Sequence, residues 1–266
     1  LTSEHTRHVC YCLTPARFLW NYHAYIEREG LGRVARSLLG PTLRGLRQWD
    51  LAAASRVDRF VAISHTVRQR IVKFYRREAD VIYPPVDTQL AASAGDVPPG
   101  DYYLVTSRLV PYKRIDLAVQ AFTKLGLPLK IVGDGRDRQA LKRLAGPTVE
   151  FLGFVRDDAA VRRLMAGCKA FVFPGEEDFG LTPVEALSAG RPVIAYAAGG
   201  ALDTVVDGQT GVLFREATPD SLAQAVRRIE ALTFDRALLR AEAERFSVPR
   251  FQRELDALLQ QELEAR

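Results

Sequence analysis

The hydrophobic positions of the second half of the chain form short apolar runs separated by helix-length segments. Five runs that predict strands lie at residues 102–106, 129–132, 149–152, 170–173 and 193–195. Segments such as 115–125 and 157–167, each of helical length, lie between them. Strands that alternate with helices in this way form a parallel sheet with helices on both faces. The pattern therefore predicts a doubly wound α/β domain.

The first part of the chain shows the same alternation in a less complete form. Apolar runs at 8–13, 60–63 and 80–83 predict strands, and Ser64 is a suitable N-cap for a helix that reaches about Tyr75. A long helical stretch from about Leu31 to Arg59 contains Gly40-Pro41, where we expect an interruption. Residues with near-heptad spacing predict one face of this stretch that packs on a core: Leu39, Leu43, Leu46, Ala53 and Val57.

A linker and a final helix complete the predicted organisation. Residues 91–100 are small, polar and rich in proline and glycine, which is typical of a connection between domains. The tail from Pro219 is helical in pattern, and Ser247 is placed to cap a last amphipathic helix. The pattern thus separates an N-terminal part, a larger α/β domain and a C-terminal helix.

Composition and charge exclude several function classes. The 266 residues are 47% hydrophobic and 26% charged, which is ordinary for a globular protein, and no apolar run approaches the roughly 20 residues of a membrane span. Lys and Arg number 37 against 32 Asp and Glu, and the two signs are interspersed, so we expect no nucleic-acid partner. Cys10, Cys12 and Cys168 lack metal-ligand spacing, are expected to be small buried side chains, and favour a cytoplasmic location.

Two basic residues follow the first strand of the predicted α/β domain. Ligands of doubly wound sheets bind beyond the carboxyl ends of the strands, so the loops after those strands are the first places to look for chemistry. The segment SRLVPYKR places Arg108 and Lys113 at such a corner. A planar guanidinium and a compact ammonium together suit a diphosphate. The alternative is that both side chains are merely solvated.

A glycine pair follows the second strand of this domain. Gly133-Asp-Gly135 would let a ligand or another backbone approach closely, although a tight turn before a helix explains it slightly better. The GxGxxG fingerprint of dinucleotide-binding domains is absent here, so a nicotinamide cofactor is not expected.

The segment EDFGLTPVE, residues 177–185, follows the fourth strand. Thr182-Pro-Val-Glu185 has the spacing of a capping box with proline at the first helical position, so one interpretation is that Glu185 caps Thr182. Glu177 needs another explanation, because like charges crowd it and only solvent or a polar ligand such as a sugar suits such a cluster. Amides of the Phe179-Gly180-Leu181 turn could hold phosphates while the carboxylates accept hydrogen bonds from hydroxyls. The ligand indicated is a nucleotide sugar.

The ordered motifs SRLVPYKRIDLAVQAF, IVGDG, VEFLGFV, EDFGLTPVE, GRPVIAY and DGQTGVLF resemble the donor-binding half of the retaining glycosyltransferases of family 4. The resemblance implies a GT-B fold of two Rossmann-like domains, the first of them incomplete in this chain. It implies a partial acceptor-side domain at 1–86, a nucleotide-sugar-binding domain at 87–246 and a returning helix at 247–266. It also implies a catalytic group of Glu177, Arg108 and Lys113, with Glu177 at the donor hexose and the two cations at the diphosphate.

Other donor contacts are implied by the same resemblance. Glu185 would bind the ribose hydroxyls, the Phe154-Val155 loop would lie against the base, and the amides of Gly180 and Leu181 would support the diphosphate. Phe179 and Gly133 complete the expected set. One departure is Leu13, which stands where relatives often carry histidine and which cannot form a hydrogen bond with a sugar.

The resemblance implies transfer of a hexose from a donor such as GDP-mannose or a UDP-sugar to a glycan or lipid-linked acceptor, with no metal and no cofactor. The alternative is a module that binds nucleotide sugars without transferring them. A pyridoxal-phosphate phosphorylase of similar architecture would need a lysine in a different context. Arginines on the long helical stretch, at 33, 36, 44 and 47, could contact acidic lipids or could form a solvated face.

Overall fold

The computed structural model describes residues 3, 5–20, 33–93 and 97–264. Contacts group the chain into two units. Unit 1 comprises Leu1–Tyr83 together with Arg253–Arg266, and unit 2 comprises Pro84–Gln252. Unit 1 is therefore assembled from both ends of the chain, whereas unit 2 is continuous.

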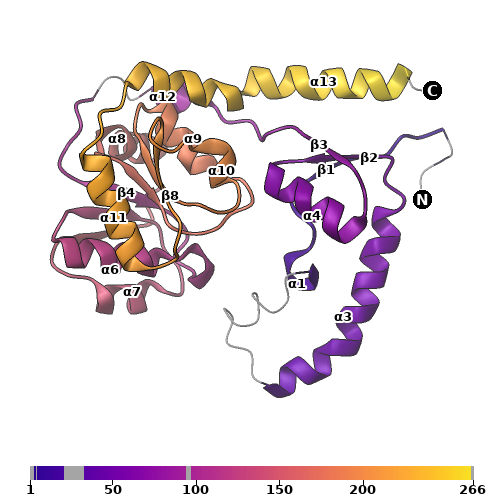
Figure 1. Ribbon diagram of the computed structural model, residues 1–266, viewed down its shortest axis with the longest axis horizontal. Coiled ribbons are helices and arrows are strands. Elements are labelled where there is room, and N and C mark those ends of the chain that lie inside the picture. Colours follow the sequence, from indigo (N-terminus) through magenta and orange to yellow (C-terminus); the bar gives the residue numbers. More distant parts are fainter. Residues whose placement is uncertain (1–2, 4, 21–32, 94–96, 265–266) are drawn as a thin grey trace. The chain divides into compact units, whose positions relative to one another are not determined.

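Unit 1 contains a small parallel sheet in the order β1-β2-β3. Its strands are β1 (Val9–Cys12), β2 (Arg59–Ala62) and β3 (Ala79–Val81). Helices α1 (Arg17–Trp20) and α3 (Arg33–Ala54) lie between β1 and β2 in the chain, and α4 (His65–Tyr75) connects β2 to β3 (Figure 1). The Ser64 hydroxyl accepts a hydrogen bond from the Val67 amide at 3.1 Å, so the predicted N-cap is confirmed.

Helix α3 differs from the prediction in two respects. It continues through Gly40 and Pro41, because the φ angle of proline is already helical and one lost hydrogen bond does not end a helix of 22 residues. Leu43 is buried as predicted, but Leu46 is 40% exposed. The buried face instead continues one turn after Leu43 with Arg47, whose Nε donates to the Leu19 carbonyl at 2.7 Å. The side chains of 33–39, with the predicted Leu39 and two of the four arginines, lie outside the described residues.

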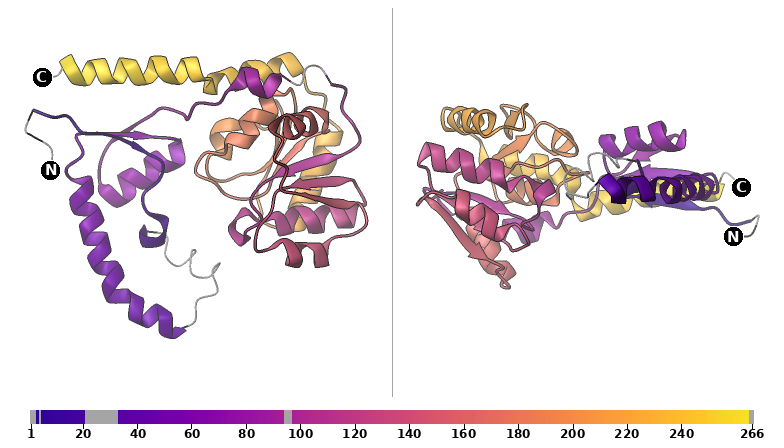
Figure 2. Two further views of the ribbon diagram at one scale, coloured as in Figure 1. Left: turned by 180° about the vertical axis from the view of Figure 1, so that it is seen from behind. Right: turned by 90° about the horizontal axis from the view of Figure 1, so that it is seen from below.

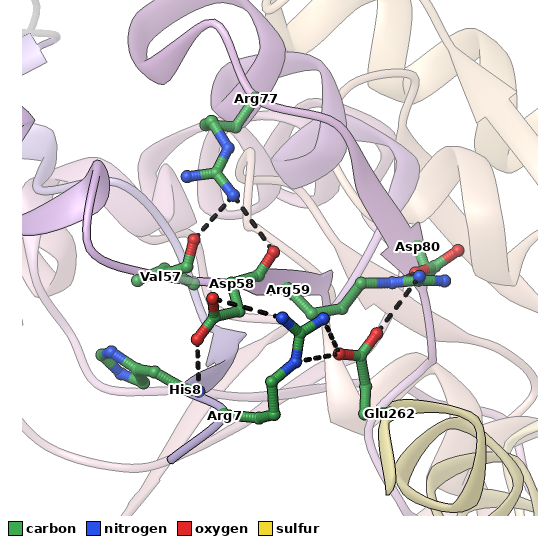
Figure 3. A network of polar contacts seen from close by, with 8 residues as sticks. All are labelled: Arg7, His8, Val57, Asp58, Arg59, Arg77, Asp80 and Glu262. Atoms are coloured by element: carbon green, nitrogen blue, oxygen red, sulfur yellow. Dashed lines mark hydrogen bonds and ion pairs between the residues drawn. The ribbon is translucent and has the colours of Figure 1, made fainter. Parts of the chain in front are cut away.

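The C-terminal helix α13 (Val248–Glu264) ends in a cluster of ion pairs within unit 1 (Figure 3). The Glu262 carboxylate accepts hydrogen bonds from Arg7 Nε at 3.1 Å and Nη2 at 2.8 Å, and from Arg59 Nη1 at 3.4 Å. The Glu262 side chain is only 8% exposed. Arg59 also donates through Nε to Asp80 at 2.6 Å, so one carboxylate of α13 is tied to the edges of β1, β2 and β3.

The same cluster fixes the turn that leads into β2. Asp58 accepts from the amide of His8 at 2.7 Å and lies 3.6 Å from Arg7. Arg77 donates to the carbonyl oxygens of Val57 at 2.6 Å and of Asp58 at 3.1 Å (Figure 3). Side chains from three separate parts of the sequence therefore hold the amino ends of the strands together.

Unit 2 is built on a six-stranded parallel sheet in the order β6-β5-β4-β7-β8-β9. The strands are β4 (Tyr103–Thr106), β5 (Leu129–Val132), β6 (Val149–Gly153), β7 (Phe171–Phe173), β8 (Val193–Tyr196) and β9 (Gly211–Phe214). The predicted doubly wound sheet is confirmed. The strand order reverses between β4 and β7, which is the topological switch point where such sheets bind ligands.

The helices of unit 2 form two groups, and the strands pass between them (Figures 1 and 2). One group contains α6 (Ile115–Leu125), α7 (Arg138–Leu144) and α11 (Pro219–Glu230). The other contains α5 (Thr88–Ala92), α8 (Asp158–Gly167), α9 (Leu181–Ser188) and α12 (Arg236–Ala243). Short segments η1 (Pro111–Lys113), α10 (Ala201–Thr204) and η2 (Glu244–Phe246) complete the unit. The ring pair of Tyr103 and Phe122, 4.8 Å between centroids, lies in the core under α6.

Two segments that the sequence placed at domain boundaries, the linker at 91–100 and Ser247, lie within unit 2. The predicted linker at 91–100 overlaps the end of α5, and residues 94–96 lie outside the described part. Ser247 immediately precedes α13, and its carbonyl accepts the Phe251 amide at 3.1 Å, as expected at a helix start. Within the described residues, no helix is both long and apolar enough to cross a membrane.

None of the three cysteines is in a disulfide, and they occupy different environments. Cys12 and Cys168 are buried, and Cys10 is half-buried beside Cys12 on β1. A hydrogen bond from Cys12 lowers the pKa of the Cys10 thiol to about 7, whereas burial raises the pKa of Cys168 to about 12. Of these two thiols, that of Cys10 is the one that ionises near neutral pH.

Candidate functional site

Four loops meet at the edge of the unit 2 sheet where its strands end. They follow β4, β5, β7 and β8, and parallel pairing brings their starting points to one side of the sheet. The two central strands, β4 and β7, flank the switch point, so the segments after Thr106 and Phe173 are the ones best placed to share a ligand. These segments contain the predicted cations and the first glutamate.

Glycines let these loops contact one another through their backbones. A Cβ atom added to each of three of them would lie at an impossible distance from a backbone oxygen: Gly133 at 1.9 Å from Ser107, Gly175 at 2.7 Å from Lys113, and Gly199 at 2.0 Å from Glu177. Gly133 also has a φ of +128°, which side-chain-bearing residues rarely adopt. Of the two interpretations of Gly133, close approach of another backbone is therefore the one that the structure supports.

The cations and the first glutamate form a chain of contacts. The Lys113 ammonium is ion-paired with the Glu177 carboxylate, and their side chains are 15% and 24% exposed. Lys113 also lies over the Tyr112 ring, 5.4 Å from its centroid, and the Tyr112 hydroxyl accepts a hydrogen bond from Arg108 Nη2 at 2.8 Å. Loops that follow different strands thus bring Arg108, Lys113 and Glu177 together. Tyr112, which joins the two cations, was not predicted, although it stands next to Lys113 in the sequence.

Helix α9 begins earlier than the sequence predicted. Its N-cap is Gly180, at φ +90° and with no side-chain cap, so Leu181 is the first helical residue and Thr182 the second. The expected capping box from Thr182 to Glu185 is therefore wrong, because the left-handed conformation that glycine permits turns the chain into the helix two residues sooner. The N-cap residue offers no side chain to the first amides of the helix, and this is the feature that favours an anion.

Glu185 lies on α9 and lines a cavity of about 300 Å³ within unit 2. Residues on α8, on α5 and just before α5 complete the lining: Val86, Asp87, Leu90, Asp158, Val161, Arg162 and Met165. Burial, and secondarily the charge of Asp158, raises the pKa of Glu185. A half-buried carboxylate that lines a cavity of this size and takes no part in capping α9 suits hydroxyl groups that donate hydrogen bonds. Asp158 and Arg162 were not predicted, and only their position just after the expected base-binding loop pointed to them.

The remaining predicted residues differ in exposure. Phe154, in the loop after β6, is 72% exposed, Val155 beside it is half-buried, and Leu181 is 47% exposed. Phe179 is buried, and its ring packs on Phe246 with 5.5 Å between centroids, so only the Phe179 backbone can face a ligand. The predicted residues thus form two groups: the cations with Glu177 at the sheet edge, and Glu185 in the cavity beside α8. Among the residues that the structure describes, no three metal-binding side chains cluster.

Comparison with known proteins also identifies the part of the chain that contains this site as a glycosyltransferase. Residues 92–246 match the family described as Glycosyl transferases group 1. An uncharacterized glycosyltransferase of Methanocaldococcus jannaschii is 26% identical over 179 residues, which cover 65% of this chain and 50% of that protein. A glycogen synthase of Xanthomonas campestris is 27% identical over 214 residues, covering 76% of this chain and 42% of that protein. The chain thus spans about half the length, or less, of these curated relatives.

Solved structures show the same fold. The apo form of the lipopolysaccharide outer core galactosyltransferase WaaB has a TM-score of 0.68 and 21% identity, with 78% of this chain and 63% of that one covered. Anabaena Alr3699/HepE in complex with UDP has a TM-score of 0.68 and 23% identity, with 80% and 68% covered. The fold is α/β of the GT-B type, with one Rossmann-like domain in unit 2 and part of another in unit 1. The family match covers the sheet, its four edge loops and Glu185, and the chain belongs to the group 1 glycosyl transferases.

Proposed function

We propose that this protein binds a nucleoside-diphosphate sugar at the edge of the unit 2 sheet and transfers its hexose, with retention of configuration, to a glycan or lipid-linked acceptor. The observation that carries the proposal is the contact between Lys113 and Glu177, which puts a phosphate-binding cation beside a hydroxyl-binding carboxylate at the switch point. A sugar diphosphate complements both residues, because its phosphates suit the cation and the hydroxyls of the attached sugar suit the carboxylate.

Two further features support a nucleotide donor. The cavity of Glu185 lies beside α8, and α8 follows the loop of the exposed Phe154, so a nucleoside there would be held by its ribose hydroxyls and by the face of its base. The uncapped start of α9 offers backbone amides to a phosphate. One structurally similar protein, Anabaena Alr3699/HepE, has been solved in complex with UDP-glucose. For the present chain, UDP-sugars and GDP-mannose are both within the proposal.

In the proposed reaction the protein contributes electrostatics and position. The leaving diphosphate gains charge as the glycosidic bond breaks, and Arg108 and Lys113 stabilise that charge, while Glu177 holds the hexose hydroxyls. Fixed charges of this kind contribute about 2–4 kcal/mol each in a transition state. We propose that these two cations do what a divalent metal does in other transferases, so that transfer needs no metal and no cofactor.

The experiment measures donor binding and transfer in the same protein. UDP- and GDP-sugars should raise the melting temperature, because they bind only the folded state. Lys113→Ala should lower the transfer rate by roughly a hundredfold or more, with a much smaller change in donor affinity. The matched control is Lys124→Ala, since Lys124 is 62% exposed and pairs with Asp220 on the surface. Equal losses of rate and affinity in the Lys113 variant would contradict the proposed role.

A second candidate is a nucleotide-sugar-binding module without transfer activity. It is favoured by Leu13, which directly follows β1, is 64% exposed and has no group that can bond a sugar. Tight donor binding with neither transfer nor donor hydrolysis, under conditions where the donor is saturating, would establish this candidate instead.

A location in the cytoplasm with peripheral membrane contact is part of the proposal. Thiols that form no disulfide, such as those of Cys10 and Cys12, suit a reducing compartment. On α3, Arg44 is exposed and Trp49 is 66% exposed, a combination that can bind acidic lipid head groups. Co-sedimentation with phosphatidylglycerol vesicles should exceed that with phosphatidylcholine vesicles and should fall with salt; binding that ignores lipid charge would exclude this contact.

A further inference from the structure

Glu177 is paired with Lys113, the cation that would bind the donor diphosphate in the proposed function. The Glu177 carboxylate is ion-paired with Lys113, and both side chains are largely removed from solvent, at 24% and 15% exposed. A diphosphate that arrives at Lys113 therefore meets an anion already in place. Two anions that share one ammonium repel each other, and the repulsion is larger where solvent screens poorly.

The backbones on both sides of this ion pair are held in position. The carbonyl of Glu177 accepts the Gly200 amide at 2.8 Å, and Gly199 packs against the same carbonyl. On the other side, Gly175 packs against the backbone of Lys113. The loops therefore cannot move apart easily, and the carboxylate leaves Lys113 by side-chain rotation.

Once displaced, the Glu177 carboxylate needs new hydrogen-bond donors. Glu176 and Asp178 flank it on the loop and are acidic, so they offer none. Arg108 donates to Tyr112 through Nη2, and in the proposed function its remaining N–H groups bind the diphosphate. The hydroxyls of a hexose attached to the diphosphate are suitable donors. A bare nucleoside diphosphate, which is the product after transfer, brings the same negative charge without those hydroxyls.

We propose that Glu177 makes the site discriminate between the nucleotide sugar and the bare nucleoside diphosphate. This inference rests on the proposed function, because it takes Lys113 as the diphosphate ligand. The donor compensates the displaced carboxylate with its sugar hydroxyls, whereas the product leaves it uncompensated. The ion pair therefore weakens product binding selectively, and Lys113 returns to Glu177 as the product leaves.

The test compares affinities of the full chain for UDP, GDP and their glucose and mannose derivatives by calorimetry. Glu177→Gln removes the competing charge but keeps the size and hydrogen-bonding groups of the side chain. We expect this variant to bind the bare diphosphate about tenfold more tightly than the unchanged protein and to bind the nucleotide sugar no more tightly, so the preference for the sugar form falls. Circular dichroism and the melting temperature verify that the variant is folded.

Glu176→Gln is the matched control, because it removes the same charge from the neighbouring position of the same loop. We expect it to change the two affinities equally. Unchanged or weaker binding of the bare diphosphate by Glu177→Gln would overturn the inference while leaving the proposed function intact. An equal gain in the Glu176 variant would also overturn it, since the effect would then belong to the loop charge as a whole. If the unchanged protein binds neither form, the proposed function and the inference both fail.

Discussion

Replacing Gly133 with alanine should damage unit 2 far more than its size suggests. The new Cβ would lie 1.9 Å from the Ser107 carbonyl oxygen, and real Cβ atoms essentially never come closer than 3.0 Å to such an atom. The neighbour is backbone, so no side-chain rotation can relieve the contact. The loops after β4 and β5 must therefore separate by about 1 Å at Ser107, the residue directly before Arg108.

The magnitude follows from two contributions. A left-handed φ of +128° at a residue with a side chain costs about 1–3 kcal/mol, and overpacking against a fixed neighbour costs a further ~1–3 kcal/mol. We therefore expect the free energy of unfolding of unit 2 to fall by about 4 kcal/mol. In a unit of this size each kcal/mol lowers the melting temperature by roughly 2–4 °C, so the fall should be about 10 °C.

The matched control is Gly126→Ala, at the end of α6. Gly126 also has a left-handed conformation, with φ +67°, but no atom lies within 4 Å of its added Cβ, so only about 1 kcal/mol should be lost. Both tryptophans, Trp20 and Trp49, lie in unit 1, so their fluorescence does not report on unit 2. Unfolding is better followed by circular dichroism and by hydrogen exchange of β5 amides. Equal destabilisation by the two substitutions would refute the argument from backbone contact.

Three further predictions concern single side chains. Glu262→Gln should lower the free energy of unfolding of unit 1 by about 1–2 kcal/mol, because it weakens charge-assisted hydrogen bonds from partly exposed arginines. Glu264→Gln, at an exposed position, should lower it by less than about 0.5 kcal/mol. Tryptophan fluorescence during urea unfolding measures both effects, and equal effects would contradict the reasoning. Tyr112→Phe keeps the ring beside the Lys113 ammonium but loses the hydroxyl, so it should weaken nucleotide binding a few-fold. Tyr112→Leu loses the ring as well and should weaken binding more strongly. Calorimetry measures both affinities, and equal losses would mean that the ring does not contribute. Alkylation of Cys10 by iodoacetamide should accelerate as pH rises through about 7, since the pKa of this thiol is lowered and the thiolate is the reactive form. In Cys12→Ala the acceleration should move toward a pH of about 8.5. An unchanged dependence of the alkylation rate on pH would exclude the hydrogen bond from Cys12 as the cause.

Local patterns were sufficient to predict much of unit 2. The predicted segments 115–125 and 129–132 coincide with α6 and β5, because continuous apolar runs and a helical repeat ended by Gly126 leave little freedom in register. Helix α3 was harder to predict. Its near-heptad row included Leu46, but a straight helix turns by about 100° per residue, so that the face of Leu43 returns at Arg47 instead.

The long-range contacts of the candidate site could not be predicted from local pattern. The sequence places Lys113 and Glu177 in loops after two different strands, and only the strand order puts β4 next to β7 and so brings the two side chains into contact. The same limit applies to α9, where a capping-box spacing competed with the left-handed turn at Gly180 and the turn prevailed. Spacing alone does not state which of two local solutions the surrounding fold permits.

The ion-pair cluster around Glu262 also bears on how the chain folds during synthesis. Arg7 and Glu262 are 255 positions apart, and unit 1 needs residues 253–264 to complete it. Unit 2 is continuous and is available in full before those residues leave the ribosome, so it can fold first. The N-terminal strands must then wait for their last helix, and a nascent chain arrested before residue 253 should show a folded centre with an unfinished N-terminal sheet.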